Sequence, residues 1–457
     1  MDPKAYIDEL VAKARAAQAI AAEYNQEQVD RMVKGIGMRV YAEAEPLARM
    51  AVEETGKGLL AGKISKNAKT CVNAWLTLKG QKSVGVVEVD EVKQIVTIAK
   101  PAGVVCCLTP VTNPTATPPH NAMHCLKARN ACIIAPHPSA KKCCSYVCNL
   151  MRDELEKMGY PKDLIQVIEE PTMELSGLLM KSVNVIMATG GSAMVNAAYS
   201  SGRPSIGVGQ GNTQVVLDRD YDNLPLTIET VVAGRQYDNG MPCTGEQTLH
   251  VPKEKLPEII KLLDAQKGYQ IKDPADIKKL ADTYFVNGGA PNAKLVGQSA
   301  QTVAQTAGVK IPDDARIMFI VVSKWGRGEL LSREIMCPIL RVLPYDTFEE
   351  AVERARENNL YEGAGHTGVI WSNNDAHIAH MGERIPTGRL VVNQNGNAGN
   401  GGAQNNGLNH TISLGCGYWG NNSIGENVTF RHLMNYTRVS RIIKDKKILT
   451  DEEVWAD

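Results

Sequence analysis

The stretch GVVCCLTPVTNP, residues 103–114, decides the fold of this chain. Its first part, Val104 to Leu108, is a continuous apolar run, which is typical of a strand buried on both faces of a parallel sheet. Strands and helices alternate after it: we expect helices at about 121–129, 141–158 and 173–182, and strands at 131–135, 165–168 and 183–188. This alternation predicts a doubly wound α/β sheet.

Polar and glycine-containing segments follow three of these strands. Thr109 to Asn113, Pro136 to Pro138 and Thr189 to Ser192 each come directly after an apolar run. Ligands of doubly wound sheets bind beyond the carboxyl ends of the strands. These three segments therefore mark the expected ligand site.

The rest of the chain predicts a second α/β unit and smaller appendages. Apolar residues recur at helical spacing over the first hundred residues, and two alternating stretches between 84 and 98 predict a hairpin. A new strand–helix alternation begins after Gly234, and an Asn- and Gly-rich loop occupies 393–409. We therefore expect a first domain at 1–235, a second at 236–432 and a C-terminal tail at 433–457.

The composition excludes several classes of protein. The 457 residues, 43% hydrophobic and 5% aromatic, suffice for two large domains with aliphatic cores. Lys+Arg and Asp+Glu both number 50, so no net charge points to nucleic acid or an anionic membrane. No apolar run reaches the roughly 18 residues of a membrane span. No basic-then-apolar leader opens the sequence either, and we expect a cytoplasmic protein.

The cysteines indicate free thiols. Eleven of them are scattered through apolar segments, as is usual in a reducing compartment. Cys143, Cys144 and Cys148 invite a metal-binding interpretation, but only Cys144 and Cys148 share a helix face, and no CxxC pair accompanies them. We expect helix packing for these three residues and no metal.

Cys243 differs from the other cysteines in its surroundings. It lies in YDNGMPCTGEQ, residues 237–247, after Gly240 and Pro242 and just before an apolar run. A turn before a strand can present the sulfur to a cleft, where a thiolate attacks carbonyl carbon to form a hemithioacetal or acyl adduct. The alternative is a buried structural cysteine.

Three other side chains have both a functional and a structural interpretation. Asn113 stands at the mouth of the first buried strand, where its amide either donates to an oxyanion formed at Cys243 or only caps a loop. Glu334 either accepts hydrogen bonds from ribose hydroxyls or is a surface carboxylate. His366, in a Gly-rich turn, is either a proton shuttle or a structural histidine.

Two Gly-rich stretches require an interpretation. Gly207 to Asn212 is either a close backbone approach to a ligand or only a turn. Gly415 to Gly420 formally matches GxGxxG, but no clear helix follows it and it lies far from the βαβ region. We reject the second stretch as a dinucleotide fingerprint.

Taken together, these segments resemble the aldehyde dehydrogenase superfamily, and within it the CoA-acylating branch. The resemblance is closest to CoA-dependent succinate-semialdehyde dehydrogenases, followed by the aldehyde half of bifunctional aldehyde-alcohol dehydrogenases. It covers essentially the whole chain. The matching segments, in order, are TPVTNP at 109–114, RNACIIAPHP at 129–138, ATGG at 188–191, YSSGRPSIGVGQGN at 199–212, YDNGMPCTGEQ, EIMCP at 334–338, YEGAGHT at 361–367 and LGCGYWGNNSIGEN at 414–427.

The resemblance implies an aldehyde dehydrogenase-like fold: a Rossmann-type cofactor domain, an α/β catalytic domain and a small oligomerisation arm formed by 84–98 and 433–457. It implies that Cys243 is the nucleophile, and that the Asn113 amide and the Cys243 backbone N–H form an oxyanion hole. It also implies a homodimer or a dimer of dimers. The implied cofactor-binding residues are Thr109, Pro110, Pro136, His137, Pro138, Ser139, Thr189, Gly190, Gly191 and Glu334.

The implied reaction joins a small aldehyde, CoA and NAD or NADP to give an acyl-CoA and the reduced cofactor. Ser139 and Lys141-Lys142 suit a 2′-phosphate, but NAD-using relatives also carry basic residues there, so the cofactor stays open. Succinate semialdehyde is favoured, with sulfoacetaldehyde, acetaldehyde and propionaldehyde as alternatives. The residues expected to bind the substrate are Thr244, His366, Asn393 and His410.

Two departures from known relatives affect this interpretation. Succinate-semialdehyde relatives tend to carry two serines after the nucleophile, where this chain has Thr244 and Gly245. Hydrolytic aldehyde dehydrogenases carry a glutamate base in the Gly-rich segment, whereas Ser205 to Val216 contains no carboxylate. We therefore expect an acyl-thioester on Cys243 that persists until CoA attacks it. A non-catalytic structural protein is the alternative of a different class, and the presence of Cys243 argues against it.

Overall fold

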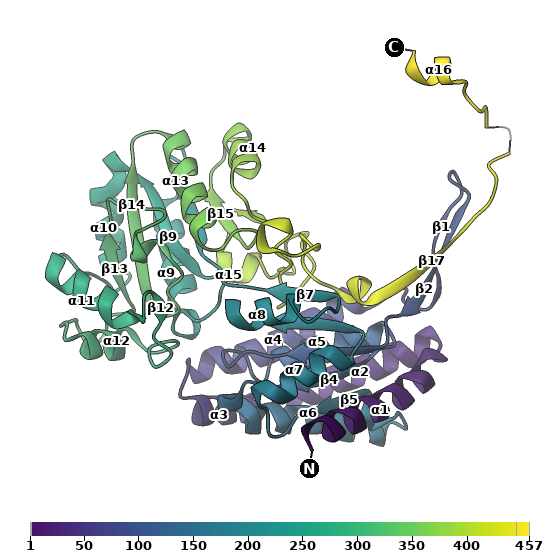
Figure 1. Cartoon of the computed structure of the whole chain (residues 1–457). Coiled ribbons are helices and arrows are strands. Elements are labelled where there is room, and N and C mark those ends of the chain that lie inside the picture. Colours follow the sequence, from purple (N-terminus) through teal and green to yellow (C-terminus); the bar gives the residue numbers. More distant parts are fainter. Residues whose placement is uncertain (1, 445, 457) are drawn as a thin grey trace.

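The computed structural model describes residues 2–444 and 446–456, which form two α/β units and a projecting arm (Figure 1). The first unit contains a five-stranded parallel sheet in the order β5-β4-β3-β6-β7. Its strands are β3 (Val104–Leu108), β4 (Ala131–Ala135), β5 (Ile165–Val167), β6 (Val185–Thr189) and β7 (Ser205–Val208). Every residue of β3 and β4 is buried, as the continuous apolar runs predicted.

Helices surround this sheet. Four come from the N-terminal region: α1 (Pro3–Ala22), α2 (Gln26–Ala42), α3 (Ala44–Thr55) and α4 (Leu60–Leu78). The others connect the strands: α5 (Thr117–Lys127), α6 (Lys141–Lys157), α7 (Met173–Ser182) and α8 (Ser192–Tyr199). The predicted doubly wound α/β arrangement is therefore confirmed. Cys143, Cys144 and Cys148 lie buried on α6.

The second unit contains a seven-stranded parallel sheet in the order β10-β13-β14-β9-β8-β15-β16. Its strands are β8 (Thr213–Leu217), β9 (Glu246–Pro252), β10 (Gly268–Gln270), β13 (Ile317–Val321), β14 (Ile339–Tyr345), β15 (Gly368–Trp371) and β16 (Leu390–Val392). Its larger helices are α9 (Leu224–Gln236), α10 (Leu256–Ala265), α11 (Pro274–Tyr284), α12 (Ala300–Ala307), α13 (Phe348–Tyr361) and α14 (Asp375–Arg384). The short hairpin β11 (Phe285–Val286) and β12 (Ala290–Pro291) stands apart from the sheet.

The sheets divide the chain at a different place from the predicted boundary at residue 235. β8 already belongs to the second sheet, so the chain crosses between the units in the Gly-rich segment before Thr213. The chain also returns to the first unit near its end, because Val428, Phe430 and Leu433 pack into the core of that unit. The first strand of the second sheet, β8, therefore precedes Gly234, after which the sequence alternation placed the second unit.

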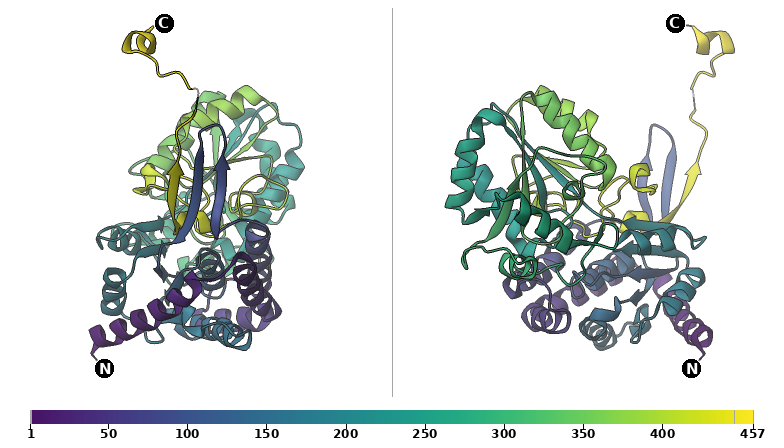
Figure 2. Two further views of the ribbon diagram at one scale, coloured as in Figure 1. Left: turned by 90° about the vertical axis from the view of Figure 1, so that its right-hand side faces the viewer. Right: turned by 60° about the vertical axis from the view of Figure 1, so that its left-hand side comes forward.

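The arm is a three-stranded antiparallel sheet that projects from the body (Figure 2). The predicted hairpin is confirmed as β1 (Gly85–Asp90) and β2 (Ile95–Pro101), and β17 (Met434–Ser440) pairs with β2 along its whole length. Beyond it the tail reaches the short helix α16 (Asp451–Trp455), whose Trp455 is 84% exposed. Within the described ranges, no helix has the length and apolar character to cross a membrane.

Candidate active site

Cys243 occupies the turn between α9 and β9, as predicted. A short 3₁₀ segment, Tyr237–Gly240, precedes it, and β9 begins three residues later. All eleven cysteines lie in the described part of the chain, and the other ten are buried, whereas Cys243 is partly exposed. Cys243 is therefore the one thiol that a substrate reaches without disturbing the core.

The Cys243 turn has an unusual backbone. Asp238, Asn239 and Gly240 are all left-handed, with φ of 49°, 55° and 69°. Such a conformation costs a non-glycine residue on the order of 1–3 kcal/mol and persists only where its surroundings enforce it. The backbone N–H of Leu59 donates to Asp238 at 2.9 Å, and the Asn239 amide donates to the Gly297 carbonyl at 2.9 Å. Contacts from both units therefore hold the turn in place.

Arg235 fixes the same turn from inside the second unit. Its guanidinium is fully buried and donates to the carbonyls of Glu246 at 3.1 Å and Gly240 at 3.4 Å. It also donates to the carbonyls of Ile335 and Cys337. One side chain thus joins the nucleophile turn, the start of β9 and the 335–337 segment.

The Gly-rich segment before β8 approaches the backbone of Cys243. A Cβ added at Gly211 would lie 1.9 Å from the Cys243 carbonyl oxygen, so only glycine fits there. The Gly211 N–H donates to Glu334 Oε1 at 3.0 Å, and Thr213 donates to the Cys243 carbonyl at 3.5 Å. The segment is therefore in close contact with the backbone of Cys243, which neither interpretation anticipated.

Gly211→Ala is expected to lower both thermal stability and kcat, because the new methyl group must displace the Cys243 backbone. We expect a loss of about 1–3 kcal/mol in the free energy of unfolding, as for other overpacked sites. Gly209→Ala is the matched control, since its new Cβ meets no atom within 4 Å. Thermal melts of the two variants measure the difference, and equal stability would contradict the packing described.

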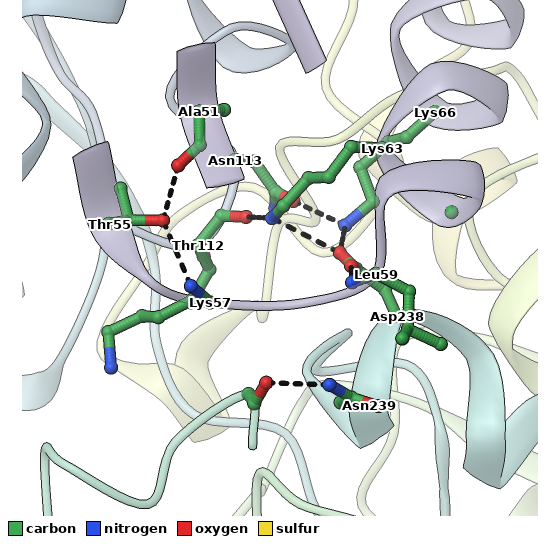
Figure 3. Close-up of polar contacts among 12 residues, drawn as sticks. Ala51, Thr55, Lys57, Leu59, Lys63, Lys66, Thr112, Asn113, Asp238 and Asn239 are labelled. Atoms are coloured by element: carbon green, nitrogen blue, oxygen red, sulfur yellow. Dashed lines mark hydrogen bonds and ion pairs between the residues drawn. The ribbon is translucent and has the colours of Figure 1, made fainter. Parts of the chain in front are cut away.

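Asn113 and the Cys243 turn meet through Lys66, a residue of α4 (Figure 3). The Lys66 ammonium donates to Asn113 Oδ1 at 2.6 Å and to Asp238 Oδ2 at 2.5 Å. Lys63, one turn earlier on the same helix, lies 3.2 Å from Asp238 Oδ2 and donates to the Thr112 carbonyl. The oxyanion-hole candidate and the turn of the nucleophile therefore belong to one polar cluster.

Burial dominates the electrostatics of the site. It raises the pKa of the Cys243 thiol to about 12, with Glu334 adding to the effect and Lys66 opposing it. Burial, together with Glu362, also holds the pKa of Glu334 well above its usual range. Burial alone would raise the pKa of Asp238, but Lys66 and Lys63 outweigh it and lower that pKa. The free thiol is therefore protonated at neutral pH.

The expected cofactor residues gather at one edge of the first sheet. β4, β3 and β6 are parallel neighbours, so Pro136 to Ser139, Thr109 to Pro110 and Thr189 to Gly191 follow them on the same side. A Cβ atom added at Gly191 would meet no neighbouring atom within 4 Å, so the space beside Gly191 at this edge is open. The remaining cofactor candidate, Glu334, is 3% exposed, and its Oε1 accepts a hydrogen bond from the Gly211 N–H.

Two expected substrate residues, His366 and Asn393, make contacts within the protein that favour other roles. His366 is fully buried beside Thr367, and burial followed by Arg389 lowers its pKa to about 3. This burial favours the structural interpretation of His366 over the shuttle and substrate-binding interpretations. Asn393 is exposed, but its amide forms hydrogen bonds with the backbone of Ser372 at 2.9 and 2.8 Å, so it caps the end of β15.

The two other expected substrate residues differ in their surroundings. His410 borders a cavity of about 320 Å³ between α4 and the 402–410 segment, and its Nδ1 contacts the Gly402 carbonyl at 3.2 Å. Thr244 directly follows the nucleophile, and its hydroxyl donates to Asn397 Oδ1 at 3.2 Å and to the Asn397 carbonyl at 3.3 Å. The Asn-rich loop therefore does reach the nucleophile turn, through Asn397 in the short helix α15 (Gly396–Gly399).

Sequence reasoning missed Lys66, Asp238 and Asn397. The signal for the first was present: Lys63 and Lys66 are one turn apart on a helix and therefore share a face. Nothing in the sequence indicated that this face is buried. Asp238 stands inside the quoted YDNGMPCTGEQ segment, but its acceptor role depends on a helix more than 170 residues earlier.

Comparison with known proteins identifies the family of the chain. The model of the aldehyde dehydrogenase family matches residues 2–283 and 320–413. The chain is 43% identical to succinate-semialdehyde dehydrogenase (acetylating) of Clostridium kluyveri over 100% of both chains. It is 40% identical to sulfoacetaldehyde dehydrogenase of Acholeplasma sp., covering 98% of this chain and 93% of that relative.

A solved structure supports the same conclusion. The acetylating aldehyde dehydrogenase of Geobacillus thermoglucosidasius superposes with a TM-score of 0.93 at 35% identity, covering 98% of each chain. The protein belongs to the aldehyde dehydrogenase family. Within that family it is similar over nearly its whole length to members named acetylating, as the resemblance of its sequence motifs indicated.

Proposed function

We propose that this protein is a CoA-acylating aldehyde dehydrogenase in which Cys243 carries the acyl group. The observation that carries the proposal is the single partly exposed thiol, held on a left-handed turn and joined by Lys66 to the Asn113 amide. The relatives named acetylating support the reaction class. The open edge beside Gly191 fits a bound NAD or NADP, which accepts the hydride of the substrate when present.

The residues of this chain perform the following steps. Cys243 Sγ attacks the aldehyde carbon, the thiol proton passes to solvent, and the C=O π electron pair moves to the oxygen, which becomes an oxyanion. The Asn113 amide and the Cys243 backbone N–H donate to that oxygen, as in other oxyanion holes. Loss of hydride then leaves an acyl-thioester on Cys243. Attack by the CoA thiol on this thioester releases the acyl-CoA and frees Cys243.

The surroundings of Cys243 disfavour water as the acyl acceptor. Ser205 to Val216 contains no carboxylate, so no general base stands where hydrolytic members carry one. Glu246 is close in sequence, but it is 1% exposed and its Oε1 accepts from the Gly396 N–H at 2.7 Å. Its other oxygen lies against Gly234. Glu246 is thus directed at the protein interior.

The substrate is proposed to be a small aldehyde with an anionic tail, succinate semialdehyde first and sulfoacetaldehyde second. Relatives at 43% and 40% identity are named for these two aldehydes. The Thr244 hydroxyl donates to Asn397 Oδ1, which places the neutral Asn397 amide, with its NH₂ donors, beside the nucleophile turn. Such donors replace the water that an anion loses when it enters a pocket.

A panel of aldehydes assayed with CoA and each cofactor tests this proposal. Succinate semialdehyde or sulfoacetaldehyde is expected to exceed propionaldehyde in kcat/KM by about 10²-fold or more, because the pocket replaces hydration that the charged tail loses. Butyraldehyde is the matched uncharged substrate for succinate semialdehyde. A preference for uncharged aldehydes would exclude an anion pocket but leave the acylating reaction standing. The same panel identifies the cofactor and, by omitting CoA, the acyl acceptor.

The arm supports a proposal on assembly. β1, β2 and β17 project from the body (Figure 2). Val86, Val89 and Val439 on these strands are exposed. Apolar residues on a projecting sheet are typical of a surface that a second subunit covers. We infer a homodimer or a dimer of dimers built through this arm.

A further inference from the structure

A buried ionic cluster lies behind the proposed oxyanion hole. Lys63 and Lys66 project from one face of α4 toward Asp238, at 3.2 and 2.5 Å (Figure 3). The side chains of Lys63 and Asp238 are 1% and 0% exposed, and that of Lys66 is 13% exposed. Charges are rarely buried unless they are paired, and here two cations share one carboxylate. Lys66 also has a second hydrogen-bond partner, Asn113 Oδ1.

The Lys66 ammonium determines which end of the Asn113 amide faces it. An ammonium group only donates hydrogen bonds, so the amide atom at 2.6 Å must be the oxygen. The NH₂ group is therefore at the opposite end, and among the described residues it has no acceptor. The Asn113 backbone is fixed separately, because its carbonyl accepts from the N–H groups of Ala116 and Thr117 at 3.3 and 3.0 Å. Lys66 therefore restricts the rotation of the Asn113 side-chain amide.

The same ammonium connects this amide to the nucleophile turn. Asp238, its second partner, is five residues before Cys243 and has left-handed backbone geometry. Lys63 completes the connection by contacting both Asp238 and the Thr112 carbonyl, next to Asn113. A shift of the turn relative to the 109–114 loop would therefore break contacts at Lys66 and Lys63 together.

We propose that Lys66 is a positioning residue of the oxyanion hole. It orients the Asn113 amide so that the NH₂ group is free for the substrate oxygen, and it fixes the position of that amide relative to Cys243. The inference rests on the proposed roles of Cys243 and Asn113. Without Lys66 the amide rotates freely, and in the flipped orientation its oxygen faces the oxyanion and repels it. A lost oxyanion donor costs about 10²–10³ in rate.

Lys66→Met is expected to lower the rate of the NAD(P)H burst by about 10²-fold, with little change in the KM of the aldehyde, because Lys66 acts only in the transition state. Lys66→Arg retains a cationic donor and is expected to recover part of the burst rate. Lys69→Met, an exposed lysine on the same helix, is the matched control and should behave as the wild type. A wild-type burst rate in Lys66→Met would overturn the inference.

A double-mutant cycle with Asn113→Ala separates positioning from general stabilisation. If Lys66 acts through Asn113, the double variant should be no slower than Asn113→Ala alone. Fully multiplicative losses would show that Lys66 acts independently of the amide and would overturn the inference. Thermal melts check folding, and if Lys66→Met does not fold, the uncharged Lys66→Gln takes its place in the cycle. Wild-type activity in Asn113→Ala would instead contradict the proposed role of Asn113 itself.

Discussion

Cys243→Ala is expected to abolish aldehyde oxidation, with a fall in kcat of about 10⁴-fold or more, as when other nucleophiles are removed. The reason is that the ten remaining cysteines are buried and none of them is placed to substitute. Binding of NADH or NADPH, measured by fluorescence titration, should survive. The expected cofactor edge follows β3, β4 and β6 and does not depend on the thiol.

Cys416→Ala is a suitable control for that experiment. Cys416 is buried, and its thiol is near enough to raise the pKa of Cys243. It lies outside the proposed machinery, so this variant should retain activity. Full activity in Cys243→Ala, or a covalent substrate label on any other cysteine, would contradict the assignment of the nucleophile.

A single turnover is the expected result when aldehyde and NAD⁺ or NADP⁺ are mixed with the enzyme in the absence of CoA. About one reduced cofactor should form per active site, and almost none should form afterwards. The reason is that the Gly-rich segment lacks a general base, a group typically worth about 10²–10⁴ in rate. Addition of CoA should restore continuous turnover. Sustained release of free carboxylic acid without CoA would show that the enzyme is hydrolytic.

Glu246→Gln tests whether Glu246 is the general base of any slow hydrolysis that remains without CoA. Burial raises its pKa to about 7, so its basic form gains population as the pH rises through that value. If Glu246 were the base, residual hydrolysis would increase over this pH range and disappear in Glu246→Gln. The bond from the Gly396 N–H predicts instead that Glu246→Gln leaves the residual rate unchanged.

The sequence predicted the first sheet well because the physical signal is local. β3 and β4 are buried on both faces, and a strand of this kind must be apolar at every position. β14 gave a weaker signal: Arg341 and Pro344 interrupt its apolar pattern. Arg341 is nonetheless buried, because the carbonyls of Leu331, Arg333 and Gln247 accept from its guanidinium. No sequence pattern reveals acceptors that come from two segments separated by more than 80 residues.

The site shows the same limit. Cys243 and Asn113 were predicted because each stands next to one end of a recognisable strand in a motif of the family. Lys66 was missed because a lysine on a helix is normally solvated, and its burial depends on Asp238 far away in the sequence. Asn393 was chosen in place of Asn397 because the conformation of a Gly- and Asn-rich loop is not determined locally. Each of these errors concerns a partner that only the tertiary fold brings close.

The proposed assembly through the arm links the stability of this enzyme to its concentration. Val86, Val89 and Val439 are 46%, 51% and 38% exposed in the single chain, so the arm gains little hydrophobic stabilisation from its own subunit. If a partner covers it, association and folding of the arm share one equilibrium, and mass action shifts that equilibrium toward the ordered arm as the protein becomes more concentrated. The midpoint of thermal denaturation then has no single value but rises with the amount of enzyme present.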